Sequence, residues 1–467
     1  MCEEKSKAEL LKEKLFMKKE HSCAVIGEKG VNEADSFADG YMNYLDASKT
    51  EREAIDTALS MAKAGGFVEF DKNVRYPAGS KVYVNNRGKA LILAVIGTRD
   101  INEGVSISAA HVDAPRIDLK PNPLYEEADM AYFKTHYYGG IKKYQWTAIP
   151  LSLHGVFVKK NGETVKVNIG DAPEDPRFVI TDLLPHLAAN QMRSTMAEGI
   201  KGETLNILIG SRPFDNTEAA EAVKLNIMNI LFEKYDITEE DFLSAELEAV
   251  PAFSACDIGF DRSLIGAYGH DDRVCAYPAL MAILDCEEPE YTAVTVLTDK
   301  EETGSEGNTG LDSKYLEYFI CDLAAVYGAE GRHVLSASKC LSADVNAAFD
   351  PNFPEVYERK NTCFINKGVC ITKYTGARGK GGTSDASAEF MAEIRSILDS
   401  ENICWQTGEL GKVDEGGGGT VAKYIAHLNV DVVDLGVPVL SMHAPFEVVS
   451  KTDVYMAYKS FLTFFNR

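Results

Sequence analysis

The stretch of sequence that decides the fold is TAVTVLTDKEETGS, residues 292–305. Its first half is rich in β-branched residues and carries no charge, which is typical of a buried strand. Its second half places two adjacent carboxylates, Glu301 and Glu302, just beyond that strand. Ligands of open α/β sheets gather beyond the carboxyl ends of the strands. The stretch therefore predicts an α/β fold with Glu301 and Glu302 where functional sites are usually built.

Two adjacent glutamates at a strand end have two interpretations. One glutamate can hold a metal ion while the other takes a proton from metal-bound water. A solvated turn explains the pair equally well, because the chain contains 71 acidic residues. The metal interpretation therefore needs further ligands at equivalent positions.

Length and charge narrow the class of protein. A chain of 467 residues that is 45% hydrophobic is long for one compact core and can build two domains. The net charge of -23 argues against a nucleic-acid partner and against anionic membranes. The N-terminus has no basic segment leading into an apolar one, and no apolar run is long enough to span a bilayer. We expect a cytoplasmic protein with neither a nucleic-acid nor a membrane partner.

The cysteines offer no metal site. All ten are scattered, without a paired C-x-x-C arrangement, so neither a disulfide framework nor a thiolate zinc site is indicated. Any metal chemistry must come from His, Asp and Glu.

The α/β pattern is interrupted once. Residues 81–96 read as a hairpin and Val105 to Ala109 as a strand, but from Arg116 to Pro251 short β-like pieces are divided by Gly and Pro. We therefore expect a catalytic domain in two parts, 1–115 and 252–467, with an inserted domain at 116–251. Within the insertion, Thr181 to Met192 looks helical, and Gly139-Gly140 is interpreted as a surface turn and not as a phosphate cradle.

Ligand-type residues follow other predicted strands and open one helix. Val105 to Ala109 leads to His111, His333 to Leu341 is interpreted as a strand leading to Asp344, and Val437 to Met442 leads to His443. Asp271 precedes a predicted helix over about 274–284. The only run of glycines, Gly416 to Gly419, lacks the Lys-Ser/Thr of a P-loop and is expected to be flexible backbone that lines a site.

Each of these residues alone has an ordinary structural explanation, as a core histidine or a helix cap. Together they are an inventory for two divalent ions that share a bridging carboxylate, with one glutamate to spare. Asp113, two residues after His111, can accept the second imidazole N–H and fix the orientation of that ring.

These motifs carry a resemblance. H-V-D-A-P at 111–115, D-D-R at 271–273, D-K-E-E-T-G-S at 299–305, S-A-D-V-N at 342–346 and M-H at 442–443 resemble, in order, the metal motifs of the aspartyl aminopeptidase family of dinuclear-zinc exopeptidases. The similarity covers nearly the whole chain. It implies a mixed β-sheet flanked by helices, as in metallo-exopeptidases, with an inserted, mainly β dimerisation domain. It also implies a homo-oligomer, a dimer-based dodecamer.

The resemblance also implies a role for each position. Asp271 bridges the two ions, His111 and Asp344 complete one site, and Glu302 and His443 complete the other. Glu301 is the general base, and the substrates are peptides with a free N-terminus. Zinc is the expected metal, although these ligand types also accept cobalt or manganese.

Three further residues are expected to bind substrate. His186 resembles a histidine of the inserted domain that reaches the substrate of a neighbouring subunit, although a core or helix role explains it nearly as well. Lys373 and Arg378 lie where the family supplies a basic contact to an acidic side chain, but K-Y-T-G-A-R-G-K-G-G at 373–382 departs from the expected Asn-rich segment. A preference for Asp or Glu is therefore a hypothesis, and an exposed loop is the alternative.

Two other functions stay open at this point. A dinuclear amidohydrolase or carboxypeptidase would use the same metal fold and differ in its product. A catalytically silent scaffold would keep the assembly alone, and the presence of all five ligands together with Glu301 counts against it.

Overall fold

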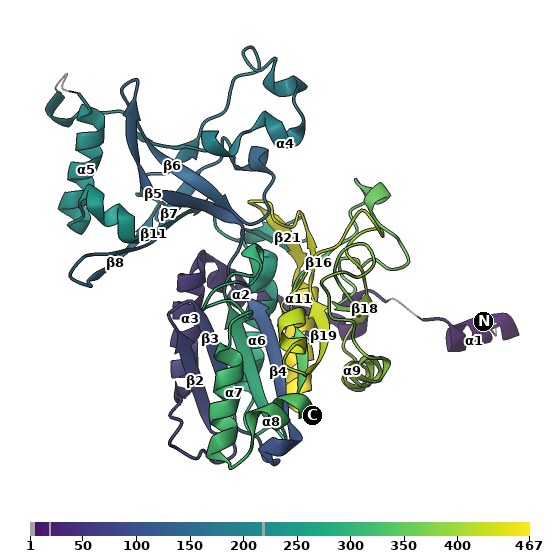
Figure 1. The fold of residues 1–467 in the computed structure, drawn as a ribbon. Coiled ribbons are helices and arrows are strands. Elements are labelled where there is room, and N and C mark those ends of the chain that lie inside the picture. The colour runs from purple at the N-terminus through teal and green to yellow at the C-terminus, as the bar shows by residue number, and fades with distance from the viewer. Residues whose placement is uncertain (1–4, 18–19, 217–219) are drawn as a thin grey trace.

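The computed structural model describes residues 5–17, 20–216 and 220–467, which form three sheets. The largest sheet forms the lower body in Figure 1, and the second stands above it. No helix of the described residues is long and apolar enough to cross a membrane.

The large sheet has nine strands and is mixed. Its strands in spatial order are β1 (Val68–Glu69), β2 (Lys81–Asn86), β3 (Ala90–Val95), β14 (Thr292–Thr298), β4 (Val105–His111), β15 (Lys339–Ser342), β19 (Asp431–Gly436), β17 (Val369–Thr372) and β18 (Trp405–Thr407). The strand predicted from residues 292–297 is thus β14, in the interior of the sheet. The hairpin predicted over residues 81–96 is the β2–β3 pair.

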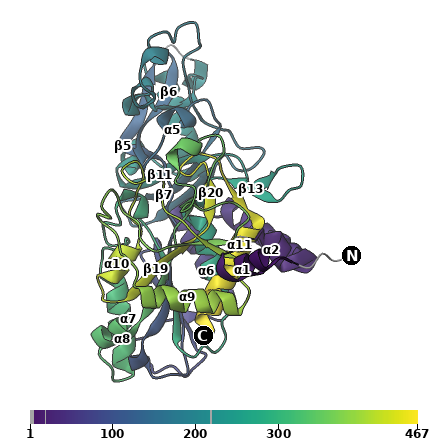
Figure 2. The same cartoon turned by 90° about the vertical axis from the view of Figure 1, so that its right-hand side faces the viewer.

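Two apolar cores cover the two faces of this sheet, because its strands are apolar on both sides. In β14, Ala293 and Leu297 join one core while Val294 and Val296 join the other. The first core packs against α2 (Ser22–Asp46), α3 (Glu51–Ala64), α6 (His270–Asp285), α9 (Ala388–Ser400) and α11 (Lys451–Phe465). The second packs against α7 (Tyr315–Val326), α8 (Gly331–Ala337) and α10 (Ala422–Ala426). Figure 2 shows α7, α8 and α10 to the left of the sheet and α2 and α11 to its right.

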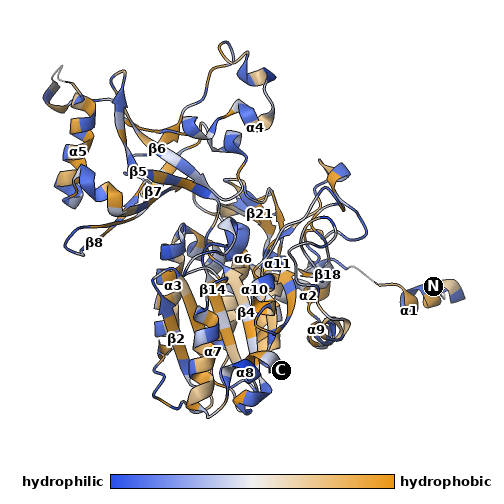
Figure 3. Ribbon diagram, in the orientation of Figure 1, coloured by the Kyte–Doolittle hydropathy of each residue, from blue (hydrophilic) through white to orange (hydrophobic). Residues whose placement is uncertain are grey.

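Neighbouring parallel strands bring the ligand-type residues to one edge of the sheet. β14 runs parallel to β4, with Thr298 opposite His111, and β4 runs parallel to β15. β15 in turn runs parallel to β19, with Ser342 opposite Asp434. Four strands therefore end at the same edge, which is hydrophilic where it meets the upper layer in Figure 3.

One strand prediction is wrong in its first half. Residues 333–341 were expected to be a single strand, but Gly331–Ala337 is helix α8 and only Lys339–Ser342 is strand β15. Val334 and Leu335 of this short helix are buried. Their apolar pattern is therefore compatible with a helix as well as with a strand.

The seven-stranded unit, residues 116–251, stands over that edge. Its strands in spatial order are β8 (Thr164–Ile169), β7 (Leu151–Val158), β11 (Ala245–Pro251), β5 (Arg116–Glu127), β6 (Met130–Tyr138), β10 (Ile207–Gly210) and β9 (Val179–Ile180). Helices α4 (Met196–Gly199) and α5 (Ala222–Tyr235) lie beside this sheet. The helix predicted over 181–192 is wrong: the segment is irregular, with one short 3-10 turn beginning at Gln191. Leu183, Leu184 and Leu187 are exposed there, so no core holds a helix.

The third sheet has five strands and leads to the last motif. Its spatial order is β12 (Cys256–Ile258), β13 (Leu264–Ala267), β21 (Glu447–Ser450), β20 (Pro438–Leu440) and β16 (Asn346–Ala347). The connection between β20 and β21 carries His443. The remaining helix, α1 (Lys7–Leu15), projects from the body near the N-terminus.

A buried histidine joins the seven-stranded unit to the main body and predicts a pH-dependent stability. His154 on β7 lies 2.8 Å from Glu53 on α3 and 3.4 Å from Asp171. Burial disfavours its charged form, but the bonds to Asp171 and Glu53 outweigh this and raise the pKa of His154 above its usual value. The stabilisation is therefore complete below the unfolded pKa of about 6.5 and is lost as the pH rises through the higher folded pKa.

We expect His154→Gln to lower the thermal midpoint most at about pH 6, and the difference from wild type to shrink towards about pH 9. Differential scanning calorimetry across this range measures it. His136→Gln is the control, because His136 lies exposed on β6 of the same unit. A difference that stays constant with pH would contradict the assignment of the ion pair.

Candidate active site

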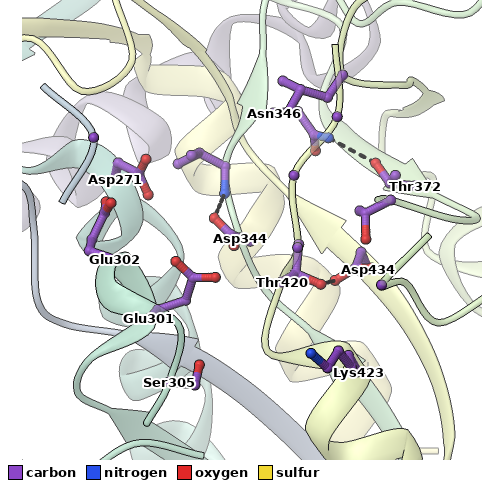
Figure 4. Close-up of a pocket in the computed structure, with 18 of the residues that line it drawn as sticks. Asp271, Glu301, Glu302, Ser305, Asp344, Asn346, Thr372, Thr420, Lys423 and Asp434 are labelled. Carbon is purple, nitrogen blue, oxygen red and sulfur yellow. Dashed lines mark hydrogen bonds between the residues drawn. The ribbon is translucent and has the colours of Figure 1, made fainter. Parts of the chain in front are cut away.

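Six side chains from separate parts of the chain meet at the common edge. His111 is the last residue of β4, Glu301 and Glu302 lie in the short turn after β14, and Asp344 follows β15. Asp271 lies in the first turn of α6, and His443 lies between β20 and β21. Figure 4 shows Asp271, Glu302, Glu301 and Asp344 on one wall of a cavity.

Asp271 lies between the two histidines. Its Oδ1 is 3.1 Å from Nε2 of His111, and its Oδ2 is 3.1 Å from Nε2 of His443. Nε2 of His111 is also 3.8 Å from Asp344 Oδ1, and Nε2 of His443 is 3.6 Å from Glu302 Oε1. The cluster therefore has two halves that share one carboxylate.

The donor atoms of this cluster fit zinc. Ligand atoms of His111, Glu301 and Asp344 lie within 4.8 Å of one another, as do those of His111, Asp271 and Glu302. His111 Nε2, Asp271 Oδ1 and Glu302 Oε1 are buried without a hydrogen-bond partner. Such atoms are costly to bury unless a ligand satisfies them, and imidazole with carboxylate oxygen is a donor set that zinc accepts.

Burial and crowding make Glu301 and Glu302 hard to ionise without a cation, whereas His111 and His443 outweigh the effect of burial on Asp271 and lower its pKa. Burial, together with the charge of Asp344, raises the pKa of Glu301 to about 8. Burial and the charge of Asp271 raise the pKa of Glu302 well above its usual range. A divalent cation between these groups would remove the mutual repulsion.

Two acidic residues, Asp113 and Glu447, hold the cluster from outside. Nδ1 of His111 lies 3.0 Å from the Asp113 carbonyl oxygen and 3.3 Å from its Oδ1. The Asp113 carboxylate also accepts the backbone N–H groups of Glu301 and Glu302, at 3.2 and 3.3 Å. Glu447, fully buried, accepts the backbone N–H of Asp271 at 3.1 Å and that of His443 at 2.7 Å. Backbone and side chain of the cluster are thus both fixed.

The cluster opens into a cavity of about 470 Å³. The glycine run predicted to line a site does so with Gly417, Gly418 and Gly419. Burial raises the pKa of Asp434 in the cavity wall to about 7, and Thr420 donates a hydrogen bond to it at 2.9 Å. Figure 4 shows Lys423 on the segment that follows Thr420, across the cavity from Glu301.

The three residues expected to bind substrate do not reach this cavity in the single chain. His186 is exposed in the irregular 181–190 segment of the seven-stranded unit. Lys373 donates a hydrogen bond to Asp385, and Arg378 lines a separate, smaller cavity. The cation that does line the cavity of the cluster is Lys423.

Sequence reasoning missed several residues of the site. Lys423, Asp434 and Glu447 carry no motif of their own, and Tyr138 and Gly140 belong to the seven-stranded unit. Glu447 and Asp434 had one signal, since they are acidic residues within apolar strands. Gly139-Gly140 is a bend with Gly140 exposed, in agreement with the predicted surface turn, but the prediction missed that Gly140 contacts His443 and lines the cavity.

A family model described as Aminopeptidase I zinc metalloprotease (M18) matches residues 44–465. The chain belongs to the M18 family.

Its relatives agree over nearly the full length. A probable M18 family aminopeptidase 1 of Clostridium acetobutylicum is 48% identical over 447 residues, which cover 94% of this chain and 96% of that protein. The crystal structure of an M18 family aminopeptidase from Thermotoga maritima has a TM-score of 0.93 at 42% identity and covers 97% of this chain and 100% of that chain. Aminopeptidase I from Clostridium acetobutylicum has a TM-score of 0.90 at 43% identity with the same coverage. The M18 chain is therefore a zinc metallo-aminopeptidase, and the predicted family and α/β fold are confirmed.

A more distant solved structure shows the fold alone. The mApe1 dodecamer of S. cerevisiae is 20% identical, with a TM-score of 0.75, and covers 93% of this chain and 97% of that chain.

Proposed function

We propose that this M18 aminopeptidase removes the N-terminal residue of peptides at a dinuclear zinc site. Asp271 would be shared by the two ions, His111 and Asp344 would hold one of them, and Glu302 and His443 would hold the other. The observation that carries this proposal is the placement of Asp271, with one carboxylate oxygen 3.1 Å from each histidine. A single ion would serve only one of the two pairs, His111 with Asp271 or His443 with Asp271.

Glu301 is the general base in this proposal. Two zinc ions bound there would supply a water that loses a proton near neutral pH and a Lewis acid for the peptide carbonyl. Glu301 accepts the proton of the attacking water and returns it to the leaving amine. The contact between its backbone N–H and Asp113 holds Glu301 beside the cluster.

The surplus of carboxylates around Asp271 favours the free amino end of a peptide over its carboxyl end. Cleavage is therefore restricted to the first peptide bond. This favours the aminopeptidase over the carboxypeptidase and amidohydrolase alternatives, which would release a C-terminal residue or an acyl group.

We also propose a preference for Asp or Glu as the first residue, with Lys423 as the cation that contacts it. In the part of the chain that the structure describes, Lys423 lines the cavity and makes no ion pair. Lys373 is held by Asp385 instead. The proposed contact to an acidic side chain is therefore a residue different from Lys373 and Arg378, the two expected from the sequence.

A panel of zinc-loaded reactions tests these assignments. We expect wild type to release the first residue of Asp- and Leu-peptides, to favour Asp, and to leave N-acetylated peptides intact. Lys423→Met removes one charge-assisted contact and is expected to lower the Asp-to-Leu ratio of kcat/KM about tenfold or more. Lys373→Met is the matched control and keeps the ratio. An unchanged ratio for Lys423→Met would remove Lys423 from the subsite, and cleavage of acetylated peptides would rule out the aminopeptidase assignment.

We propose further that residues 116–251 form an inserted dimerisation domain and that the chain assembles into a dimer-based homo-oligomer, as large as a dodecamer. The support is an exposed apolar patch on the seven-stranded unit, formed by Leu183, Leu184, Leu187, Met192 and Met196. Monomers rarely leave such a patch uncovered. His186 lies in the same exposed segment. If a neighbouring copy of the chain packs against this patch, His186 of one copy would approach the cavity of the other. The cytoplasmic location stays a prediction.

A further inference from the structure

The segment Tyr138–Gly140 connects the seven-stranded unit to the metal cluster. Tyr138 ends β6, and its hydroxyl donates a hydrogen bond to Oδ2 of Asp113 at 2.8 Å. Two residues later, the carbonyl oxygen of Gly140 lies 2.7 Å from Nδ1 of His443. One short segment therefore contacts an outer partner of the first half, Asp113, and a proposed ligand of the second half, His443.

On the first half, Tyr138 fixes a carboxylate that has several tasks. Asp113 is fully buried and faces Nδ1 of His111 as well as the backbone N–H groups of Glu301 and Glu302. A carboxylate with this many donors needs one fixed rotamer to serve them all. The Tyr138 hydroxyl is the one side-chain hydroxyl that donates to it among the described residues, and it comes from outside the main body.

The Tyr138 ring is itself held in place. The guanidinium of Arg116 lies 3.9 Å from the ring centroid. Arg116 is buried and lies 3.2 Å from both Glu51 on α3 and Glu248 on β11. The contact with Arg116 therefore fixes the position of the Tyr138 ring, and with it the position of the hydroxyl that faces Asp113.

On the second half, a carbonyl oxygen determines which nitrogen of His443 carries the proton. A carbonyl only accepts, so Nδ1 of His443 is the donor to Gly140 and Nε2 is left as the electron pair that faces Asp271. The segment also needs its glycines. A Cβ on Gly140 would lie 3.3 Å from Nδ1 of His443, and one on Gly139, whose φ is +72°, would lie 3.1 Å from Oε2 of Glu302.

We propose that Tyr138 and Gly140 are positioning residues for the zinc ligands, so that the seven-stranded unit helps to build the metal site of the main body. The inference rests on the proposed dinuclear function. Partners of this kind contribute about 10- to 100-fold to metal affinity or activity. The ligand geometry then depends on how the seven-stranded unit is seated on the main body.

The test measures zinc retention by the full-length chain without peptide, by competition with a chelator. Tyr138→Phe keeps the ring and removes the hydroxyl, and we expect zinc affinity to fall about tenfold. Tyr137→Phe, on the same strand with a hydroxyl that makes no hydrogen bond among the described residues, is expected to leave it unchanged. Gly140→Ala crowds His443 and is expected to weaken zinc retention similarly, while Gly199→Ala, whose Cβ meets only ordinary contacts, does not.

The thermal midpoint of the zinc-free protein separates positioning from folding. We expect zinc-free Tyr138→Phe to have the same thermal midpoint as zinc-free wild type. Only the zinc-loaded proteins should differ in their thermal midpoints. Zinc affinity within twofold of wild type for both variants would overturn the proposal. A thermal midpoint of Tyr138→Phe that falls as much without zinc as with zinc would overturn it too. If Gly140→Ala does not fold, a crystal structure of zinc-loaded wild type decides that half. A separation between His443 Nδ1 and Gly140 O beyond about 3.2 Å would contradict it.

These outcomes can be told apart from failure of the proposed function. If zinc-loaded wild type hydrolyses no peptide while Tyr138→Phe still loses zinc, the function fails and the positioning role stands. If wild type hydrolyses peptides and the variants retain zinc and activity, the positioning role fails and the function stands.

Discussion

Glu301→Gln is expected to leave zinc content unchanged and to lower kcat by about three orders of magnitude. The amide keeps the size of the side chain but cannot accept the proton of the attacking water, and general-base catalysis is worth about 10²- to 10⁴-fold. KM should change little, because Glu301 acts on the water and not on the peptide. Steady-state hydrolysis of an N-terminal residue, with zinc determined by mass spectrometry on the same samples, measures both quantities.

Glu306→Gln is the matched control for this change. Glu306 lies five residues further along the same loop, is exposed, and is not part of the cavity wall. Its activity should equal that of wild type. A Glu301→Gln protein that keeps more than about a tenth of wild-type kcat would show that another group takes the proton. If neither wild type nor Glu301→Gln shows activity, although both assemble and bind zinc, the scaffold alternative would be favoured.

Asp271→Asn is expected to abolish activity by removing the shared ligand. One of its carboxylate oxygens faces each histidine, so the neutral amide weakens both halves together. Losing one partner from a buried charged cluster typically costs several kcal/mol, which is more than a hundredfold in affinity. We expect bound zinc to fall below one ion per chain and kcat/KM to fall at least a thousandfold.

Asp285→Asn serves as the control for Asp271→Asn, because it changes an exposed aspartate at the opposite end of α6. It should keep both zinc and activity. Should Asp271→Asn still bind two zinc ions with wild-type affinity, the bridging role would be wrong even if activity were lost. Loss of a single ion, with the other held normally, would place Asp271 in one half only.

The framework of the main sheet was predictable from local pattern. The run that forms β14 is apolar on both faces, and such runs lie between two layers of helices. His111 and Glu301 were found for the same reason, since each follows such a strand and parallel strands end together. Asp271 and His443 were also found from local pattern, before a predicted helix and after a predicted strand, and the resemblance to a known family added their roles as ligands.

The errors arose where tertiary contacts decide the outcome. A buried helix of seven residues and a strand have similar apolar patterns, and α8 was therefore interpreted as part of a strand. A substrate contact by Lys373 stays a prediction, and the sequence did not show that Asp385 pairs with it. The contact of Gly140 with the site was missed because its partner, His443, lies 303 residues away in the chain. Such pairings become visible only when the chain is folded.

The most direct test of the account is anomalous diffraction from crystals of the zinc-loaded protein, collected on either side of the zinc absorption edge. For a dinuclear site we expect two peaks about 3.5 to 4 Å apart, one beside His111 and Asp344, the other beside Glu302 and His443, with Asp271 between them. A single peak, or two peaks that do not share Asp271, would contradict the dinuclear site on which the proposed chemistry depends.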